Sequence, residues 1–154
     1  MSITVHKDVM VAMRDGVELA TDLWVPETAP APTLLVRLPY SKDLPALLGY
    51  GLVPNLFALV EAGYAVVYQD CRGTFRSAGE FTPMLNEPDD GADTIGWLLE
   101  QPWCDGNIGT YGPSYLGFVQ WASGGSTSSP PTPRGRSPSS GPGPAPPRPG
   151  RDSG

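Results

Sequence analysis

Apolar and polar residues alternate along the first 25 positions of the chain, and this alternation predicts two β-strands. In residues 3–13 and again in residues 17–25, most apolar side chains fall on one parity, as in strands that bury one face. Asp15-Gly16 lies between the two segments, and Asp-Gly is a strong hairpin signal because glycine accepts the positive φ that the turn demands. The chain is therefore expected to open with an antiparallel hairpin.

From residue 33 onward the pattern changes to short strand-like segments separated by helix-like ones. The predicted strands are residues 33–38, 64–68 and 107–111, and the predicted helices are residues 54–62, residues 89–101 and a segment that begins at Tyr115. The first two of these strands are nearly continuous apolar runs, as expected for strands that are covered on both faces. Strands that alternate with helices indicate an α/β fold, in which a parallel sheet carries helices on both faces.

The ends and the inner faces of these helices are also predictable. Pro54 suits the first position of a helix and Gly63 suits its C-terminal cap, because proline lacks a backbone donor and glycine accepts left-handed backbone angles. In the second helix, the spacing of Ala92, Ile95 and Leu99 predicts that these three side chains face the core.

Composition divides the chain into two parts. Of the 33 residues from 122 to 154, 24 are Gly, Pro or Ser, and none is Val, Ile, Leu, Met or aromatic. Such a segment cannot bury enough apolar surface to offset the entropy lost on ordering the chain. We therefore expect a folded part at residues 1–121 and a disordered tail at residues 122–154.

Charge and cysteine usage argue against several classes of function. Residues 1–121 carry a net charge of −9, which argues against nucleic-acid binding. No apolar run has the length of a membrane span, and the first residues lack the layout of a secretory signal peptide. Cys71 and Cys104 form no recognisable disulfide framework and are interpreted as free thiols of a cytoplasmic protein.

Charged residues around the second predicted helix are interpreted as structural. Asp89, Asp90 and Asp93 lack the spacing of a calcium-binding loop, and carboxylates favour the positive end of a helix dipole. We therefore expect no metal and no cofactor. Arg72 follows a predicted strand and is interpreted as an arginine that holds a loop, with binding of a substrate carboxylate as the alternative.

One hexapeptide has the character of a catalytic turn, namely Gly112-Pro113-Ser114-Tyr115-Leu116-Gly117. It lies where a predicted strand passes into a predicted helix, which is the context of a nucleophile elbow. Such a tight turn forces the serine into strained backbone angles and lets the next amide point at an oxyanion. The pattern departs from the G-x-S-x-G form because Leu116 takes the second small position. A glycine-rich turn with an idle serine is the alternative interpretation.

Other motifs follow one another in a specific order along the chain. They are MRDGV (13–17), VRLPYSK (36–42), GYAVV (63–67), QDCRG (69–73), SAGEF (77–81), DTI (93–95) with Trp97, and QPWCDGNIG (101–109). Together with the hexapeptide, they resemble the cocaine-esterase and X-Pro dipeptidyl-peptidase family of serine hydrolases. The resemblance runs from about residue 5 to Trp121.

This resemblance implies an α/β-hydrolase fold and a Ser-Asp-His hydrolase of acyl esters or amides. It implies that Ser114 is the nucleophile, and that the phenol of Tyr40 and the backbone amide of Tyr115 form the oxyanion hole. From the residues alone, a tyrosine at a strand end is interpreted as a packing residue. The expected partner is a small ester, amide or peptide substrate, and esters, X-Pro peptides and β-lactam side chains all remain open.

The residues that complete such a triad are not found after Ser114. In this fold the order along the chain is Ser, Asp, His, but the one acidic residue after Ser114 is Asp152, and the single histidine is His6. The sequence therefore predicts a truncated α/β-hydrolase fold, with an antiparallel hairpin followed by a parallel β-α-β-α-β unit up to the elbow. The alternative is a non-catalytic, poorly folded remnant without turnover.

The abrupt change of composition after residue 121 predicts that the tail is translated out of frame. Gly, Pro, Ala and most Arg codons are rich in G and C, as expected when a GC-rich gene is read in a wrong frame. Translation of the same DNA in the other two frames should resume a helix after Trp121 and later supply Asp and His. If neither frame does so, the tail is a natural Pro/Ser-rich linker instead.

Overall fold

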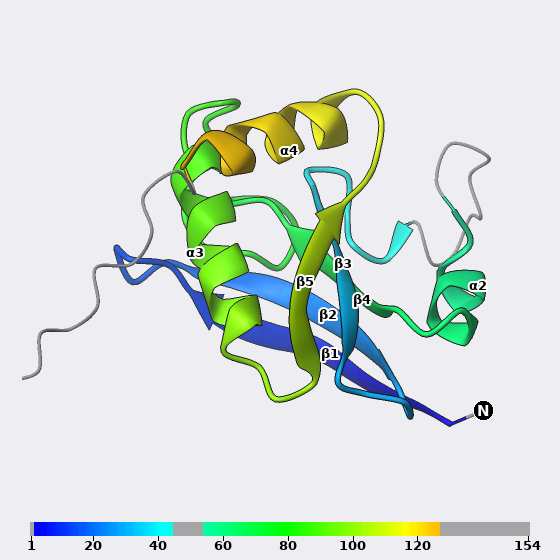
Figure 1. The fold of residues 1–154 in the computed structure, drawn as a ribbon. Coiled ribbons are helices and arrows are strands. Elements are labelled where there is room, and N and C mark those ends of the chain that lie inside the picture. Colours follow the sequence, from blue (N-terminus) through cyan, green and yellow to red (C-terminus); the bar gives the residue numbers. More distant parts are fainter. Residues whose placement is uncertain (1, 45–53, 127–154) are drawn as a thin grey trace, which may run out of the picture.

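The computed structural model describes residues 2–44 and 54–126, which form a mixed five-stranded sheet with helices on both faces (Figure 1). The strands are β1 (Ile3–Ala12), β2 (Glu18–Pro26), β3 (Ala31–Leu38), β4 (Ala65–Asp70) and β5 (Cys104–Thr110), and the helices are α2 (Leu56–Glu61), α3 (Glu87–Leu99) and α4 (Tyr115–Ser126). The strands lie in the order β1-β2-β4-β3-β5, with β2 antiparallel to both neighbours and β3 parallel to both. The predicted α/β architecture is confirmed.

The opening hairpin turns at Gly16, as the Asp-Gly pair predicts. Gly16 has a φ of +84°, and its amide donates a hydrogen bond to the carbonyl of Met13 at 2.9 Å. Further back in β1, the register shifts between His6 and Val9, and Asp8 lies there in the left-handed region with a φ of 56°. The first strand therefore contains one bulge, at a polar residue.

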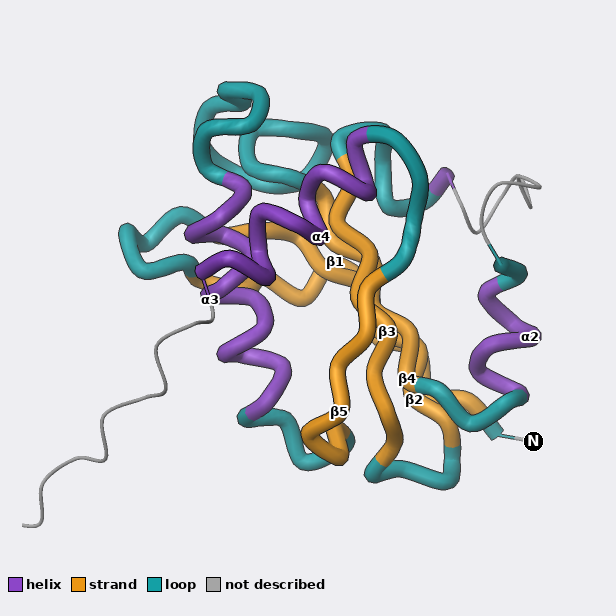
Figure 2. The backbone as a smooth tube through the Cα atoms, turned by 45° about the horizontal axis from the view of Figure 1, so that its top comes forward, coloured by secondary structure: helices purple, strands orange, loops and turns teal. Residues whose placement is uncertain are grey.

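Helices cover both faces of the sheet. Figures 1 and 2 show α2 on one face, and α3 and α4 on the other. Alternating side chains of the strands fill two cores. The core under α2 comprises Trp24, Val36, Leu38, Leu56, Val60, Val66, Tyr68 and Leu116, and the core under α3 comprises Leu23, Val25, Leu35, Val67 and Leu98. Every residue of β4 is buried, which agrees with its nearly continuous apolar run.

Helix α2 begins at a different residue from the predicted one. Its N-cap is Asn55, whose side-chain oxygen accepts hydrogen bonds from the amides of Phe57 at 2.9 Å and Ala58 at 3.3 Å. Pro54 therefore precedes the cap, because the asparagine side chain satisfies the free amides of the first turn. Gly63 follows the helix in the left-handed region, with a φ of +94°, as predicted.

Helix α3 begins and ends two residues earlier than predicted, and its buried face also differs. Leu98 is fully buried, whereas Leu99 is 53% exposed, so the prediction for Leu99 is wrong. The buried residues of α3 are Glu87, Asp90, Gly91, Thr94 and Leu98. The Thr94 hydroxyl donates to the side chain of Gln69 in β4 at 2.9 Å. The spacing of apolar residues therefore misses Thr94, which is buried because its hydroxyl has a polar partner in the sheet.

β5 is the last strand of the described sheet. It pairs with β3 on one side, with Thr110 opposite Leu35, and within residues 2–44 and 54–126 no strand pairs with its outer edge. Helix α4 follows it and continues to Ser126, beyond the boundary that composition predicts at residue 121. Residues 127–154 lie outside the described residues, so the disorder of the tail stays a prediction.

Replacement of Leu35 by Ala is expected to destabilise the fold by about 2–5 kcal/mol, because it opens a cavity in the core under α3. Leu35 is 2% exposed and lies in β3, between β4 and β5. The matched control is Leu99→Ala, which removes the same atoms from an exposed site and is expected to change stability by no more than about 0.5 kcal/mol. Urea unfolding followed by circular dichroism measures both, and equal losses would contradict this packing.

Candidate active site

Ser114 lies in the turn between β5 and α4. Residues 111–114 alone connect the end of the strand to the start of the helix. Ser114 is exposed and has a φ of 56°, a conformation that costs a non-glycine residue about 1–3 kcal/mol. A strained, exposed serine between a strand and a helix has the geometry of a nucleophile elbow.

Glycine at position 112 allows this turn to be tight. Gly112 has a φ of +133°, and a Cβ at this position would lie 2.6 Å from the Cβ of Leu116. Leu116 is buried in the core under α2, so it fills the space that a side chain at position 112 would need. A Cβ at Gly117 would lie 3.4 Å from the carbonyl oxygen of Gly112. The larger residue at position 116 is therefore accommodated because position 112 has no side chain.

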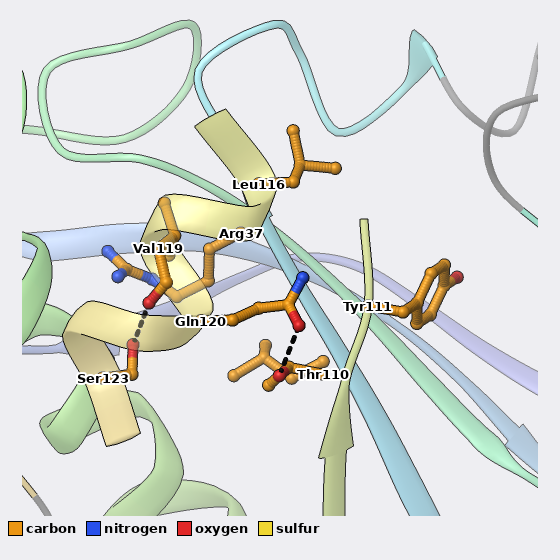
Figure 3. Close-up of a pocket in the computed structure, with 8 residues that line it drawn as sticks. Arg37, Thr110, Tyr111, Leu116, Val119, Gln120 and Ser123 are labelled. Atoms are coloured by element: carbon orange, nitrogen blue, oxygen red, sulfur yellow. Dashed lines mark hydrogen bonds between the residues drawn. The ribbon is translucent and has the colours of Figure 1, made fainter. Parts of the chain in front are cut away.

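Gln120 of α4 forms hydrogen bonds to the turn and to the end of β5. Its side-chain amide donates to the carbonyl of Gly112 at 3.0 Å. Its side-chain oxygen accepts from the hydroxyl of Thr110 at 3.0 Å, as Figure 3 shows. A cavity of about 10 Å³ is lined by Gln120, Thr110 and Arg37, and it is too small for any substrate. Ser114 does not line this cavity.

Tyr40 and Ser114 both lie just beyond the carboxyl ends of parallel strands, β3 and β5. β3 and β5 are parallel and pair Leu35 with Thr110, so Tyr40 follows the end of β3 where Ser114 follows the end of β5. Tyr40 is 50% exposed, which leaves its side chain open to solvent. The structure thus places Tyr40, Ser114 and Tyr115 at the carboxyl ends of the parallel strands β3 and β5. Their catalytic roles stay predictions.

A buried lysine fixes the segment that follows Tyr40. Lys42 has 0% exposure, and its ammonium lies 2.9 Å from the carboxylate of Asp22 in β2 and 2.6 Å from that of Asp8 in β1. The backbone amide of Lys42 donates to the carboxylate of Asp70 at 2.7 Å, at the end of β4. The loop is therefore held by β3 at one end and by three other strands just beyond the tyrosine.

Lys42 carries its charge because acidic partners outweigh the cost of burial. Burial would lower the pKa of Lys42, but hydrogen bonds to Asp8 and Asp22 overcome this effect and raise the pKa above its ordinary value. Lys7 also forms an ion pair with Asp22, and Arg76 forms one with Asp8. These charges form one network across β1, β2 and two loops.

A second polar group is buried on the other side of β3. Arg37 donates from Nε to the side-chain oxygen of Gln69 at 2.7 Å, and its Nη1 lies 2.9 Å from the carboxylate of Glu87 in α3. Both Arg37 and Glu87 are buried. This arginine of β3 therefore contacts both β4 and the first turn of α3, and it lies beside α4 (Figure 3).

The other acidic residues of α3 near its N-terminus pair with arginines. Arg72 donates to Asp90 at 2.6 Å, which agrees with the predicted structural role. Arg14, next to the hairpin turn, donates to Asp89 and to Asp93, each at 2.8 Å. These contacts join the hairpin and the loop after β4 to the helix.

The described residues form two open grooves away from Ser114, and they contain neither a metal-binding cluster nor a membrane-spanning helix. Two open grooves of about 450 and 400 Å³ flank β5, but Ser114 and Tyr40 line neither of them. Among residues 2–44 and 54–126, no cluster of His, Cys, Asp and Glu is arranged to hold a metal ion. In the same part of the chain, no helix is both long enough and apolar enough to cross a membrane.

The single histidine is remote from Ser114 in the sheet. His6 is exposed on β1, the first strand in the order of the sheet, whereas Ser114 follows β5, the last strand. His6 is therefore not placed to take a proton from Ser114. Cys71 and Cys104 are free thiols, as predicted, and burial raises the pKa of Cys71, so that it stays protonated.

Comparison with known proteins identifies the family. The chain matches the profile of the family described as X-Pro dipeptidyl-peptidase (S15 family) over residues 15–133, which is more than half of its length. The chain belongs to this family. The match includes both the end of β3 with Tyr40 and the turn with Ser114.

Individual members and relatives agree with this assignment. Cocaine esterase from Rhodococcus sp. is 52% identical over 120 residues, which are 77% of this chain and 21% of that protein. A CocE/NonD family hydrolase from Staphylococcus aureus has a TM-score of 0.70 at 30% identity, covering 80% of this chain and 25% of that chain. An α-amino acid ester hydrolase has a TM-score of 0.64 at 30% identity, covering 76% and 23%. This member of the family thus spans about a fifth to a quarter of the length of these relatives.

Sequence reasoning does not identify the roles of Lys42, Asp8 and Asp22. Asp22 carries a usable signal, because an acidic residue inside an apolar strand needs a buried partner. The sequence does not say which cation supplies it, since Lys42 lies in a loop and Asp8 lies in a bulge.

Replacement of Lys42 by Met is expected to destabilise the fold by about 3–5 kcal/mol, because it removes the buried cation and leaves the buried Asp22 paired with the more exposed Lys7. The matched control is Lys7→Met, which removes another cation of Asp22 from a side chain that is 41% exposed, and it is expected to cost at most about 1 kcal/mol. Urea unfolding near neutral pH measures both variants.

The pH dependence of this effect provides a further check. Because folding raises the pKa of Lys42, its stabilisation is fully present below the unfolded pKa of about 10.4 and is lost as pH rises through the folded pKa. A loss in Lys42→Met no larger than that in Lys7→Met would contradict the buried role of Lys42.

Proposed function

We propose that the chain carries the nucleophile and the oxyanion hole of a serine hydrolase that acts on acyl esters or amides. Ser114 is the nucleophile, and the phenol of Tyr40 and the backbone N–H of Tyr115 are the oxyanion donors. The observation that carries this proposal is the left-handed φ of 56° at the exposed Ser114, in a turn at the edge where Tyr40 lies. Membership of the family supports it.

The reaction that fits these groups is acyl transfer to the serine hydroxyl. The oxygen of Ser114 bonds to the carbonyl carbon of the substrate, its proton goes to a base, and the carbonyl oxygen becomes an oxyanion. The N–H of Tyr115 is the first amide of α4, and such amides have no acceptor within their own helix, so it suits an oxyanion. The leaving group departs with the proton, and water then cleaves the acyl-serine to release the acid.

We propose further that the base and the orienting carboxylate of the triad are not residues of this chain. His6 lies on β1 at the opposite edge of the sheet, and Asp152 is the one acidic residue after Ser114. Without its base, a triad retains only the rate enhancement that comes from the oxyanion hole and substrate binding. Turnover by this chain is therefore expected to lie close to background.

The relatives support a class of substrate and a location. Their names refer to cocaine, to α-amino acid esters and to X-Pro dipeptides, which share a carbonyl carbon bearing an alcohol or amine leaving group. We extend this class, small esters, amides or peptides, to the present chain, with β-lactam acyl groups as a further member. Free thiols at Cys71 and Cys104 support a cytoplasmic location.

A non-catalytic remnant is the second candidate function, and two observations favour it. In the described part of the chain, no strand covers the outer edge of β5, and an unpaired edge promotes aggregation. The single histidine also lies away from Ser114. In this alternative the chain is poorly soluble and Ser114 is inert.

Incubation of the full chain with excess p-nitrophenyl acetate is expected to acetylate Ser114 once per chain, slowly and without turnover. The strained turn and the oxyanion donors favour attack by this serine, while the lack of a base keeps the step slow. Release of p-nitrophenol measures the amount, and peptide mass spectrometry locates the acetyl group. Added imidazole supplies a base and is expected to raise the rate at which mass spectrometry finds acetyl-Ser114, a readout that hydrolysis of the ester by imidazole itself does not raise.

Two serine variants control this experiment. Ser114→Ala is expected to abolish the stoichiometric release, whereas Ser2→Ala, at another exposed serine, is expected to leave it unchanged. Circular dichroism checks that both variants remain folded. Equal labelling of the wild type and Ser114→Ala would reject Ser114 as the nucleophile and favour the remnant.

A further inference from the structure

The phenol of Tyr115 is anchored beside the elbow. It donates to the carboxylate of Glu87 at 3.0 Å and accepts a hydrogen bond from the amide of Met84 at 3.2 Å. The rings of Phe81 and Phe118 lie next to it, with centroid separations of 6.3 and 5.9 Å. The residue whose N–H is proposed to meet the oxyanion is therefore also held at the far end of its side chain.

Glu87, which accepts this hydrogen bond, is itself held in place. Its other carboxylate oxygen lies 2.9 Å from Nη1 of Arg37, an ion pair that lacks hydrogen-bond geometry. Arg37 donates to the side-chain oxygen of Gln69 at 2.7 Å, and the same oxygen accepts from Thr94 at 2.9 Å. The acceptor of the Tyr115 phenol is thus connected to β3, β4 and α3 through buried polar contacts.

The direction of the Tyr115 N–H depends on the backbone angles of Ser114. Those angles cost about 1–3 kcal/mol and persist only where surrounding contacts hold both sides of the turn. Gln120 holds the strand side, because it donates to the carbonyl of Gly112 at 3.0 Å. On the helix side, the corresponding side-chain contact is the one between Tyr115 and Glu87.

We propose that Glu87 is a positioning residue, which fixes the N–H of Tyr115 in the oxyanion hole by holding its phenol. Arg37 contributes because it orients Glu87, and it lies three residues before Tyr40 in the chain. One strand, β3, therefore locates both oxyanion donors, Tyr40 through the main chain and Tyr115 through Arg37 and Glu87. This inference rests on the proposed function, because it concerns the same oxyanion hole.

The Tyr115 phenol keeps its proton near neutral pH, so that it remains a donor. Burial, together with the negative charge of Glu87, raises the pKa of Tyr115 to about 12. The phenol therefore keeps the proton that it donates to Glu87.

Three variants of the full chain test this inference: Tyr115→Phe, Glu87→Gln and the double variant. All of them keep the Tyr115 N–H, so none deletes the oxyanion donor itself. Each single variant is expected to slow acetylation of Ser114 by p-nitrophenyl acetate about tenfold, less than the roughly 10²–10³-fold effect of losing a donor outright. The double variant should be no slower than the slower single variant, because both substitutions act on one contact: Tyr115→Phe removes the donor, and Glu87→Gln replaces the carboxylate acceptor with a weaker neutral one.

Tyr64→Phe is the matched control for the loss of a phenol. Tyr64 lies just before β4, at the strand end away from the turn, and is 37% exposed, so removal of its hydroxyl should not slow acetylation. Wild-type acetylation rates in Tyr115→Phe, or losses that multiply fully in the double variant, would overturn the inference. Tyr115→Phe carries the test if Glu87→Gln does not fold.

A second measurement does not depend on acylation. Hydrogen exchange at the amides of Leu116 and Phe118, followed by NMR, reports opening of the turn, because these amides donate to the carbonyls of Pro113 and Ser114, each at 3.1 Å. It should be faster in Tyr115→Phe and Glu87→Gln and unchanged in Tyr64→Phe, because only the first two loosen the turn locally. If the wild type is not acetylated, the proposed function fails, and exchange then decides the positioning role of Glu87. Unchanged exchange in Tyr115→Phe would overturn it, and faster exchange would support it.

Discussion

The parallel pairing of β3 with β5 is the constraint on which the candidate site depends. It sets Leu35 opposite Thr110, so the loop after β3 and the turn after β5 leave the sheet at one edge. A slip by one position would move Tyr40 relative to Ser114 by about 3.3 Å, the rise of one strand residue. A hydrogen bond does not tolerate such a shift. The proposed chemistry therefore depends on strand register before it depends on any side chain.

Strained backbone angles occur in the connections that follow β3, β4 and β5, and buried polar side chains lie next to two of them. The described non-glycine residues with positive φ outside the strands are Ser41, Phe75, Met84 and Ser114. Lys42 is buried next to Ser41, and Glu87 holds the residue after Ser114. Burying charges costs desolvation free energy that an apolar core avoids, so their position here favours a role in holding backbone geometry.

Much of the fold is predictable from the sequence because it depends on near neighbours. The opening hairpin and the buried run of β4 follow from a period of two and from the backbone freedom of glycine. The errors lie where a polar side chain finds an unexpected partner. Asn55 caps α2, so Pro54 lies outside the helix, and the contact of Thr94 with the sheet accompanies the burial of Leu98 in place of Leu99.

The sequence by itself determined the family, the order of the elements and the choice of Ser114 and Tyr40 as candidate site residues, because local patterns and ordered motifs carry this information. Only the tertiary structure decided that Lys42 is buried among carboxylates and that the phenol of Tyr115 meets Glu87. These partners lie on different strands, helices and loops. Which of them meet depends on the register of the sheet and on which polar groups leave water together, and neither is contained in a pattern along the chain.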